Sequence, residues 1–254
     1  MTTASEQQLA KEHRAYWDKG ADIYDGIIHN EFTNGAYEKW ELIISRLLKD
    51  KKGLKVLDVG TGPCFFGILL SRLGHNVTAI DSSPEMIAKA KKNAAHFGCP
   101  IQIIETDIFE FNPVEQFDLI ISRNVTWFLT NPVRAYRNWH SWLNEGGDVI
   151  IFDGNWNLFL TDPKEAYLQK LAQQEAVEQG YIPYRTEDEI AEGHDFALSL
   201  PLSYVKRPVW DVDMLKHIGF KQVQVWQGFD ADIQSHAEQV LNQHKPMFAI
   251  TATK

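Results

Sequence analysis

Between Leu54 and Asp153 the chain alternates between short apolar runs and longer segments that have the periodicity of helices. Strands that alternate with helices form a mostly parallel sheet that is covered by helices on both faces. The strands expected here are 55–59, 76–80, 101–105, 117–122 and 148–153, and the helices between them are 64–73, 84–97 and 132–143. This pattern predicts an α/β fold.

Two segments depart from the alternation. Residues 1–50 are expected to form an N-terminal helical cap that Gly20 and Gly26 break into pieces. Between residues 155 and 210 the alternation stops, and we interpret this segment as a substrate cap inserted over the strand ends at which open α/β sheets bind ligands. Helices at 163–179, 212–218 and 230–244 and strands at 221–226 and 247–253 complete one seven-stranded domain, 1–254.

Composition narrows the class of protein. A net charge of −9 disfavours a nucleic-acid partner bound over a broad surface. The two cysteines, Cys64 and Cys99, have no metal-ligand spacing, so we expect reduced thiols and no bound metal. No apolar run approaches the roughly 20 residues that a membrane-spanning helix needs, and the polar first residues lack a secretory signal. These features predict a cytoplasmic protein without a membrane partner.

The first strand ends in a glycine-containing turn, Asp58-Val59-Gly60-Thr61-Gly62-Pro63-Cys64. Glycines allow a close approach of backbone to a ligand, and a helix expected to begin near Pro63 would direct its free N–H groups at that ligand. Asp81 ends the next strand about 20 residues after Gly62, where an acidic side chain accepts hydrogen bonds from a ribose. The pattern predicts a nucleotide or nucleoside site.

The same turn distinguishes between two kinds of ligand. A dinucleotide site requires a third glycine in Gly-x-Gly-x-x-Gly, and Phe65 stands at that position. Asp58 would also lie beside the pyrophosphate, where a carboxylate is electrostatically unfavourable. The turn therefore favours a ligand that carries an amine and one carboxylate.

These motifs resemble those of the class I, Rossmann-like S-adenosylmethionine-dependent methyltransferases that act on small molecules. Residues 117–124 and 143–147 resemble two further motifs of that family, the second being the turn before strand five. The resemblance implies S-adenosylmethionine as the cofactor. Its implied ligands are Asp58, Gly60, Thr61 and Gly62 at the methionine end, Asp81 at the ribose, Ser82, Met86, Thr106, Asp107 and Ile108 at the adenine, and Arg123 nearby.

The aromatic residues of the cap segments are candidates for further contacts. Tyr16 and Tyr24 either donate a hydrogen bond to the cofactor carboxylate or pack between cap and core. Asn124, at the end of strand four, can orient a substrate amine or hydroxyl. The remaining candidates for substrate binding are Trp127, Asn155 and Trp156 as parts of an aromatic pocket with amide donors, Tyr184, and Arg207 or, alternatively, Arg185 as a ligand for a carboxylate.

The sequence thus predicts methyl transfer to an unidentified small molecule by in-line displacement, with no residue identified as a general base. Three alternatives stay open on the sequence alone. The same cofactor can be attacked at another sulfonium carbon, which yields methylthioadenosine in place of S-adenosylhomocysteine. A binding module without catalysis is the second alternative. A nicotinamide oxidoreductase is the third, and Asp58 and the missing glycine disfavour it.

Overall fold

The computed structural model describes residues 4–49, 51–182 and 186–254. The chain divides into two compact units, which comprise residues up to 121 and residues from 122 onward, and the boundary falls inside strand β4 (Phe117–Arg123). Among the described residues, no helix combines the length and the apolar character needed to span a membrane. The expectation that 1–254 form one domain stays a prediction.

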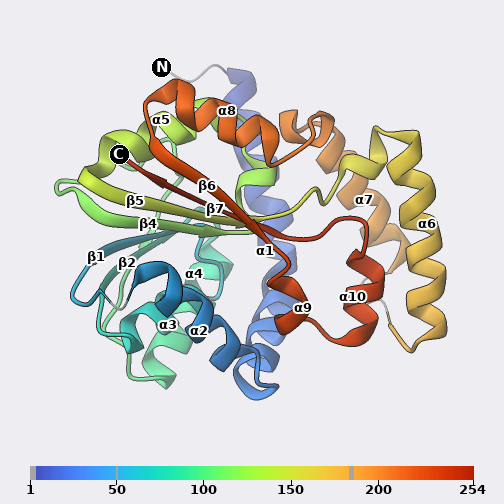
Figure 1. Cartoon of the computed structure of the whole chain (residues 1–254), viewed down its shortest axis with the longest axis horizontal. Coiled ribbons are helices and arrows are strands. Elements are labelled where there is room, and N and C mark those ends of the chain that lie inside the picture. The colour runs from blue at the N-terminus through green and yellow to red at the C-terminus, as the bar shows by residue number, and fades with distance from the viewer. Residues whose placement is uncertain (1–3, 50, 183–185) are drawn as a thin grey trace. The chain divides into compact units, whose positions relative to one another are not determined.

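The seven strands are ordered β3-β2-β1-β4-β5-β7-β6 in the sheet (Figure 1). In the first unit β2 pairs in parallel with both β1 and β3, and in the second unit β7 pairs antiparallel with both β5 and β6. This arrangement confirms the mostly parallel α/β sheet. The bounds of the other strands are Lys55–Val59 for β1, Asn76–Asp81 for β2, Gln102–Glu105 for β3, Leu143–Asp153 for β5, Lys221–Gln227 for β6 and Phe248–Thr253 for β7.

Burial explains why the central strands form from continuous apolar runs. Val56, Leu57 and Val59 of β1 are at most 1% exposed, and residues 119–121 of β4 are completely buried. Strands covered on both faces bury every side chain, so their sequences do not alternate between apolar and polar residues. The polar Asp58 is an exception within β1, and its burial is explained by the turn that follows.

The first unit contains helices α1 (Ala4–Thr33), α2 (Ala36–Leu48), α3 (Phe65–Arg72) and α4 (Pro84–His96). The prediction that Gly20 and Gly26 break the N-terminal helix is wrong, because α1 runs through both of them. A glycine inside a helix costs only about 1 kcal/mol, which tertiary contacts readily outweigh. Such contacts exist here, since α1 packs on α4 (Figure 1).

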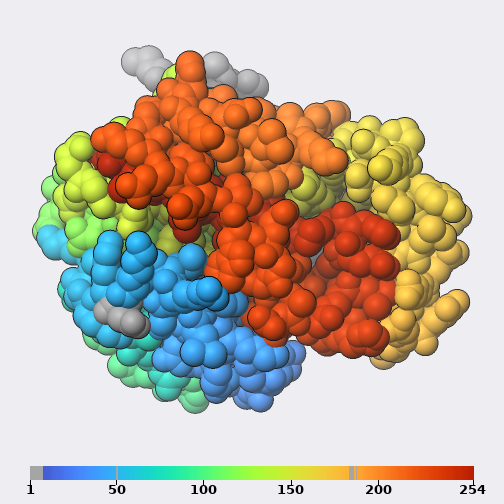
Figure 2. Space-filling model, viewed as in Figure 1, coloured from blue at the N-terminus to red at the C-terminus, as the bar shows by residue number. Residues whose placement is uncertain are grey.

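The helices of the second unit also depart from expectation in places. They are α5 (Pro132–Trp142), α6 (Pro163–Glu178), α7 (Glu187–Leu198), α8 (Val209–Ile218), α9 (Asp230–Ile233) and α10 (His236–Asn242). Helix α7 was not predicted, and the helix expected at 230–244 is two short helices. Gln234 is extended between them, and Ser235 starts α10 with a capping box. Figure 2 shows α10, in red, packed against α6, in yellow.

Strand β5 is longer than predicted. It begins at Leu143 rather than at Asp148, so the residues expected to form a turn, 143–147, belong to the strand. Gly146 has a φ of +75°, which still bends the backbone at this point. Pairing with β7 begins only at Asp148.

Candidate functional site

The turn after β1 contains three residues in the left-handed region, Gly60, Gly62 and Cys64, with φ values of +65°, +51° and +76°. Thr61 lies among them and donates its backbone N–H to the Ile80 carbonyl at 3.0 Å, which joins the turn to β2. Helix α3 begins at Phe65 and not near Pro63 as expected, because Cys64 has a left-handed conformation that cannot belong to a right-handed helix.

Asp58 holds this turn from inside the core. Its side chain is buried, and its Oδ2 accepts a hydrogen bond from the Thr61 hydroxyl at 2.6 Å. A buried carboxylate requires hydrogen-bond donors, and the turn supplies this one. The same contact fixes the orientation of Thr61.

Asp81 connects the two loops at the ends of β1 and β2. Its Oδ2 accepts the backbone N–H of Gly62 and its Oδ1 that of Ser83, each at 2.9 Å. Burial raises the pKa of Asp81, and the backbone hydrogen bonds from Ser83, Gly62 and Ser82 oppose that shift. Each carboxylate oxygen has more than one acceptor site, so these bonds leave capacity for hydroxyl donors of a ligand.

Ser83 and Met86 continue the same loop into α4. The Ser83 hydroxyl caps α4 by accepting the Met86 backbone N–H at 3.1 Å, and it donates to Asp18 of α1 at 2.5 Å. The Met86 sulfur lies beside the glycine turn, since a Cβ placed on Gly62 would be 3.8 Å from it. The loop and the turn therefore form one cradle, which Ser83 links to α1.

Further polar contacts join α1 to α4. Lys89 pairs with Asp22 at 2.5 Å, and Asn93 donates from its side-chain nitrogen to Asp25 at 2.8 Å and to the Pro63 carbonyl at 3.1 Å. Asn93 therefore connects α1, α4 and the turn after β1. The helix expected to form a cap is held directly against the cradle.

Tyr16 and Tyr24 lie on α1 on either side of the buried Trp17. Both rings contact Trp17 edge-on, with centroid distances of 5.2 Å and 5.4 Å. Both tyrosines are partly exposed. This arrangement fits the packing role considered for them, and a contact with the cofactor stays a prediction.

The segment after β3 reaches the cradle through its backbone. Thr106 donates its backbone N–H to the Asp81 carbonyl at 2.9 Å. Asp107 accepts the backbone N–H of Phe109 at 2.7 Å, so one of its oxygens organises the following turn. Thr106, Asp107 and Ile108 are all partly exposed. The first unit thus brings together the residues predicted at 58–62, 81–86 and 106–108.

In the second unit, Asn124 follows β4 and has a φ of +57°. Its backbone N–H donates to the Phe152 carbonyl of β5 at 2.8 Å, and its backbone carbonyl accepts from the Trp127 indole at 2.9 Å. The Asn124 side-chain Oδ1 is buried and has no hydrogen-bond partner among the described residues. Asparagine is one of the few residues besides glycine that adopt this conformation readily.

Asp153, at the end of β5, organises the segment that contains Trp127. Its Oδ1 accepts the Gly154 backbone N–H at 2.8 Å, and its Oδ2 accepts from the Thr126 hydroxyl and, at 2.9 Å, from the Trp127 backbone. Asp153 is completely buried. The ends of β4 and β5 are therefore joined by one carboxylate.

Arg207 supplies the positive charge for this buried region. Its Nη1 lies 3.1 Å from Asp153, and its Nη2 and Nε lie 2.8 Å and 2.9 Å from the two oxygens of Asp211. Tyr136 donates its hydroxyl to Asp211 at 2.5 Å, and burial together with the Asp211 charge raises the pKa of Tyr136. The contacts with Asp153 and Asp211 account for the charge of Arg207, so a structural role replaces the expected contact with a substrate carboxylate.

Asn155 and Trp156 follow directly. The Asn155 side chain accepts the backbone N–H of Arg207 at 2.9 Å and donates to the Arg207 carbonyl at 2.7 Å. The Trp156 ring covers Gly154 so closely that a Cβ there would lie 2.8 Å from it. The Trp156 indole nitrogen is buried and has no hydrogen-bond partner within the described ranges. Tyr184 and Arg185 lie outside the residues that the structure describes.

Comparison with known proteins agrees with this geometry. A family model described as a methyltransferase domain matches residues 50–195, which include the cradle of the first unit and the segment from Asn124 to Trp156. The chain belongs to the class I S-adenosylmethionine-dependent methyltransferases. The expected cofactor is confirmed with the family, and the nicotinamide alternative is not supported.

Individual relatives are similar to this chain over different shares of their length. A glycine/sarcosine N-methyltransferase of Aphanothece halophytica is 26% identical over 96% of this chain and 97% of its own. A ubiquinone biosynthesis O-methyltransferase of Bradyrhizobium diazoefficiens is 30% identical over 50% of each chain, so only half of that relative is matched. The N-methyltransferase NodS of Bradyrhizobium japonicum, solved with S-adenosyl-L-homocysteine, has a TM-score of 0.54 at 19% identity over 85% of this chain and 86% of its own, which shows the shared fold.

Some residues that organise the candidate site were not among those predicted from the sequence. Ser83 could have been recognised as the N-cap of α4, since serine before proline at a helix start is a common signal. Asp153 and Asp211 gave no such signal, because their importance depends on an arginine that only the fold brings to them.

Proposed function

We propose that this methyltransferase transfers the methyl group to the amine nitrogen of a small molecule, and that Asn124 holds that amine. The observation that carries the proposal is the buried Oδ1 of Asn124, which lacks a partner among the described residues. An unsatisfied buried acceptor costs about 1–3 kcal/mol, and an N–H group of a substrate would remove that cost. Trp127 follows the end of β4, and Trp156 follows the end of β5. In this proposal both rings supply aromatic surface beside the acceptor.

The proposed cofactor ligands lie in the first unit, apart from Arg123. Asp81 accepts the ribose hydroxyls, Gly60, Thr61 and Gly62 face the methionine end, and Met86 packs against the adenine. The residues present fit such a ligand, since the turn has glycines where backbone must come close and Asp81 retains acceptor capacity. The same proposal includes the other cofactor contacts. They are those of Ser82, Thr106, Asp107 and Ile108 with the adenine, and those of Asp58, Tyr16, Tyr24 and Arg123 elsewhere on the cofactor.

The chemistry assigns a positioning role to the protein. S-adenosylmethionine supplies an electrophilic methyl group, and the acceptor nitrogen must present its lone pair in line with it. An amide oxygen accepts a hydrogen bond but does not take a proton at neutral pH, so Asn124 orients the amine without acting as its base. Correct orientation alone provides a large part of the rate enhancement in such reactions. The general base stays unassigned.

An amine acceptor is supported by the relative that is matched over nearly its whole length, which is named as a glycine/sarcosine N-methyltransferase. A hydroxyl acceptor is the alternative, supported by the O-methyltransferase relative. Attack at another sulfonium carbon is the third possibility and is distinguished by its nucleoside product. We further propose a cytoplasmic enzyme without a nucleic-acid partner, which the net charge of −9 supports.

The test uses purified enzyme, S-adenosylmethionine and a panel of small primary and secondary amines with matched alcohols. Mass spectrometry identifies the methylated product and separates S-adenosylhomocysteine from methylthioadenosine. We expect S-adenosylhomocysteine to form with amines. The Asn124→Gly variant is expected to lower kcat/KM about 5- to 30-fold, because one hydrogen bond to a buried group is worth about 1–2 kcal/mol.

Asn124→Gly separates the side chain from the backbone, since glycine tolerates the positive φ that alanine does not. Its cofactor affinity, measured by calorimetry, is expected to equal that of the wild-type enzyme. Methylation of alcohols only, or formation of methylthioadenosine, would contradict the proposal. So would an Asn124→Gly enzyme that retains full activity.

A further inference from the structure

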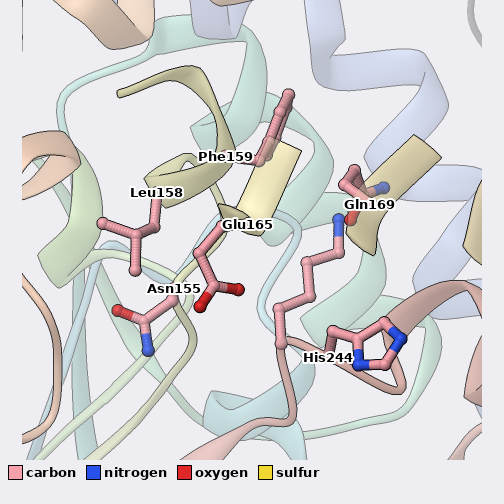
Figure 3. A pocket seen from close by; sticks show the side chains of 7 residues that line it. Asn155, Leu158, Phe159, Glu165, Gln169 and His244 are labelled. Atoms are coloured by element: carbon pink, nitrogen blue, oxygen red, sulfur yellow. The ribbon is translucent and has the colours of Figure 1, made fainter. Parts of the chain in front are cut away.

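A small pocket lies in the second unit between α6, the 3₁₀ segment Leu158–Leu160 and the link from α10 to β7 (Figure 3). The space at its centre is about 10 Å³, which holds one water-sized group and fits the end of a molecule rather than a whole one. Its lining combines two apolar side chains with five polar ones: Asn155, Leu158, Phe159, Glu165, Gln169, His244 and Lys245.

Lys245 is the cation of this pocket. It is partly buried, and no carboxylate within the described part of the chain forms an ion pair with it, although Glu165 lines the same pocket. Its Nζ lies 5.6 Å from the centre of the Phe159 ring, where the face of an aromatic ring attracts a cation only weakly. Loss of hydration lowers the pKa of Lys245 to about 8. A partly desolvated ammonium without an anionic partner gains stability from a bound anion.

The other polar groups limit what that anion can be. The carboxylate of Glu165 lines the same pocket and repels a second negative charge, which favours a singly charged anion over a dianionic phosphate. Gln169 is 6% exposed and presents an amide that can donate to an anion. His244 also lines the pocket. His194 packs against Phe159, and its pKa is lowered mainly by burial and to a smaller extent by the charge of Lys245, against the opposing charge of Asp195.

We propose that this pocket binds the carboxylate of the methyl acceptor, with Lys245 as its cationic ligand and Gln169 as a hydrogen-bond donor. The inference rests on the proposed function and narrows its substrate class to amino acids and related amino carboxylates. Asn155 lines the pocket and directly precedes Trp156, an acceptor candidate, in the chain. Lys245 takes the role that the sequence suggested for Arg207, whose guanidinium is occupied by two aspartates.

The first experiment measures binding without catalysis. Protein labelled with ¹³C-lysine is titrated between pH 6 and 11 by NMR, and the Lys245 signal is assigned with the Lys245→Arg variant. Acetate at 100 mM serves as the carboxylate probe, against chloride at the same ionic strength. We expect acetate to raise the pKa of Lys245 by about one unit, because a bound anion stabilises the ammonium form. An unchanged pKa would overturn the proposal.

The second experiment measures selectivity. Steady-state kinetics compare sarcosine with N-methylethylamine, which lacks the carboxylate, in the wild-type enzyme and in Lys245→Gln. We expect the variant to raise KM for the amino carboxylate at least tenfold and to leave the simple amine unchanged. Lys170→Gln, which removes an exposed lysine from the neighbouring helix α6, is the matched control and is expected to change neither substrate.

The two experiments separate the two proposals. An acetate effect on Lys245 without methylation of any amine would retain the carboxylate site and refute the amine acceptor. Amine methylation with equal KM values in Lys245→Gln and wild-type enzyme, together with an unchanged Lys245 pKa in acetate, would retain the proposed function and refute the carboxylate site. Lys245→Arg keeps the charge and is expected to retain most of the selectivity for the amino carboxylate.

Discussion

Cys64 combines a strained backbone with a buried side chain. Its φ of +76° is rare for a residue with a Cβ, and its thiol is fully buried, with a pKa raised by that burial. The thiol occupies the space above Gly67, where an added Cβ would lie 2.4 Å from the Cys64 sulfur. Gly67 is therefore required by its neighbour, and Cys64 acts as a structural filler rather than a nucleophile.

Gly67→Ala is expected to lower the free energy of unfolding by about 1–3 kcal/mol, the usual cost of overpacking a core. The same substitution in a Cys64→Gly background is expected to cost little, because the opposing sulfur is gone. Urea unfolding of the four proteins in this cycle measures the coupling. Gly26→Ala is the control, since nothing lies within 4 Å of its added Cβ, and it is expected to stabilise α1 by about 0.5–1 kcal/mol. Additive effects of the two core substitutions would refute the explanation.

At the scale of elements, α1 depends on contacts that the rest of the first unit supplies. Asp18, Asp22 and Asp25 form a row of carboxylates along α1 that meets Ser83, Lys89 and Asn93 of the α4 region. His13 of the same helix is buried, and burial lowers its pKa to about 4 despite the opposing charge of Glu12. The folded protein therefore favours the neutral imidazole.

Stability is expected to fall as the pH is lowered from about 6.5 toward 4, because the unfolded chain binds a proton at His13 before the folded chain does. The shift corresponds to a loss of about 2 kcal/mol between pH 7 and pH 5. Urea unfolding at these two pH values is expected to show a smaller loss in His13→Gln than in the wild-type protein, by about that amount. His217→Gln, at an exposed position on α8, is the control and is expected to behave like the wild-type protein. Equal losses in all three would exclude His13 as the cause.

At the scale of the molecule, the cofactor candidates belong to the first unit, apart from Arg123 in the boundary strand, and the described acceptor candidates belong to the second. Binding of a ligand stabilises the folded state that binds it by mass action. The backbone amides that gain protection from hydrogen exchange then report where the ligand is bound. Because the two sets of candidates lie in different units, the cofactor and the acceptor are each expected to protect different residues from hydrogen exchange.

S-adenosylhomocysteine at 100 times its Kd is expected to raise the free energy of unfolding by about 2.7 kcal/mol. Hydrogen exchange is expected to show new protection at residues 58–62, 81–86 and 106–108. Asp81→Ala is expected to weaken cofactor binding at least tenfold by calorimetry. Asp118→Ala is the matched control, because Asp118 also accepts a backbone N–H at 2.9 Å, from Lys55 at the other end of β1. Protection confined to residues after 121, or binding of NAD in place of the adenosyl compounds, would contradict this assignment.

The order of strands and helices and the motifs at the strand ends could be predicted from the sequence, because both depend on local patterns. Apolar runs such as 55–59 and 117–122 form strands that are buried on both faces of a sheet. A glycine turn that is followed by an acid about 20 residues later, here Asp81, indicates a nucleoside ligand from a short stretch of sequence. The family followed from these motifs. The continuity of α1 could not be predicted, since its two glycines lower the local helix propensity. The packing of α1 on α4, which outweighs that effect, is a tertiary contact.

Tertiary structure alone decided which polar side chains are available to a ligand. The sequence pointed to Arg207 and not to Lys245 as the ligand of a carboxylate. The fold, however, buries Arg207 between Asp153 and Asp211, and it leaves Lys245 in a pocket where no described carboxylate forms an ion pair with it, although Glu165 lines that pocket. Likewise, only the fold buries the Asn124 oxygen away from any donor that the structure describes. The physical reason is that a charge or a hydrogen-bonding group is defined by its neighbours, and residues distant in sequence supply them.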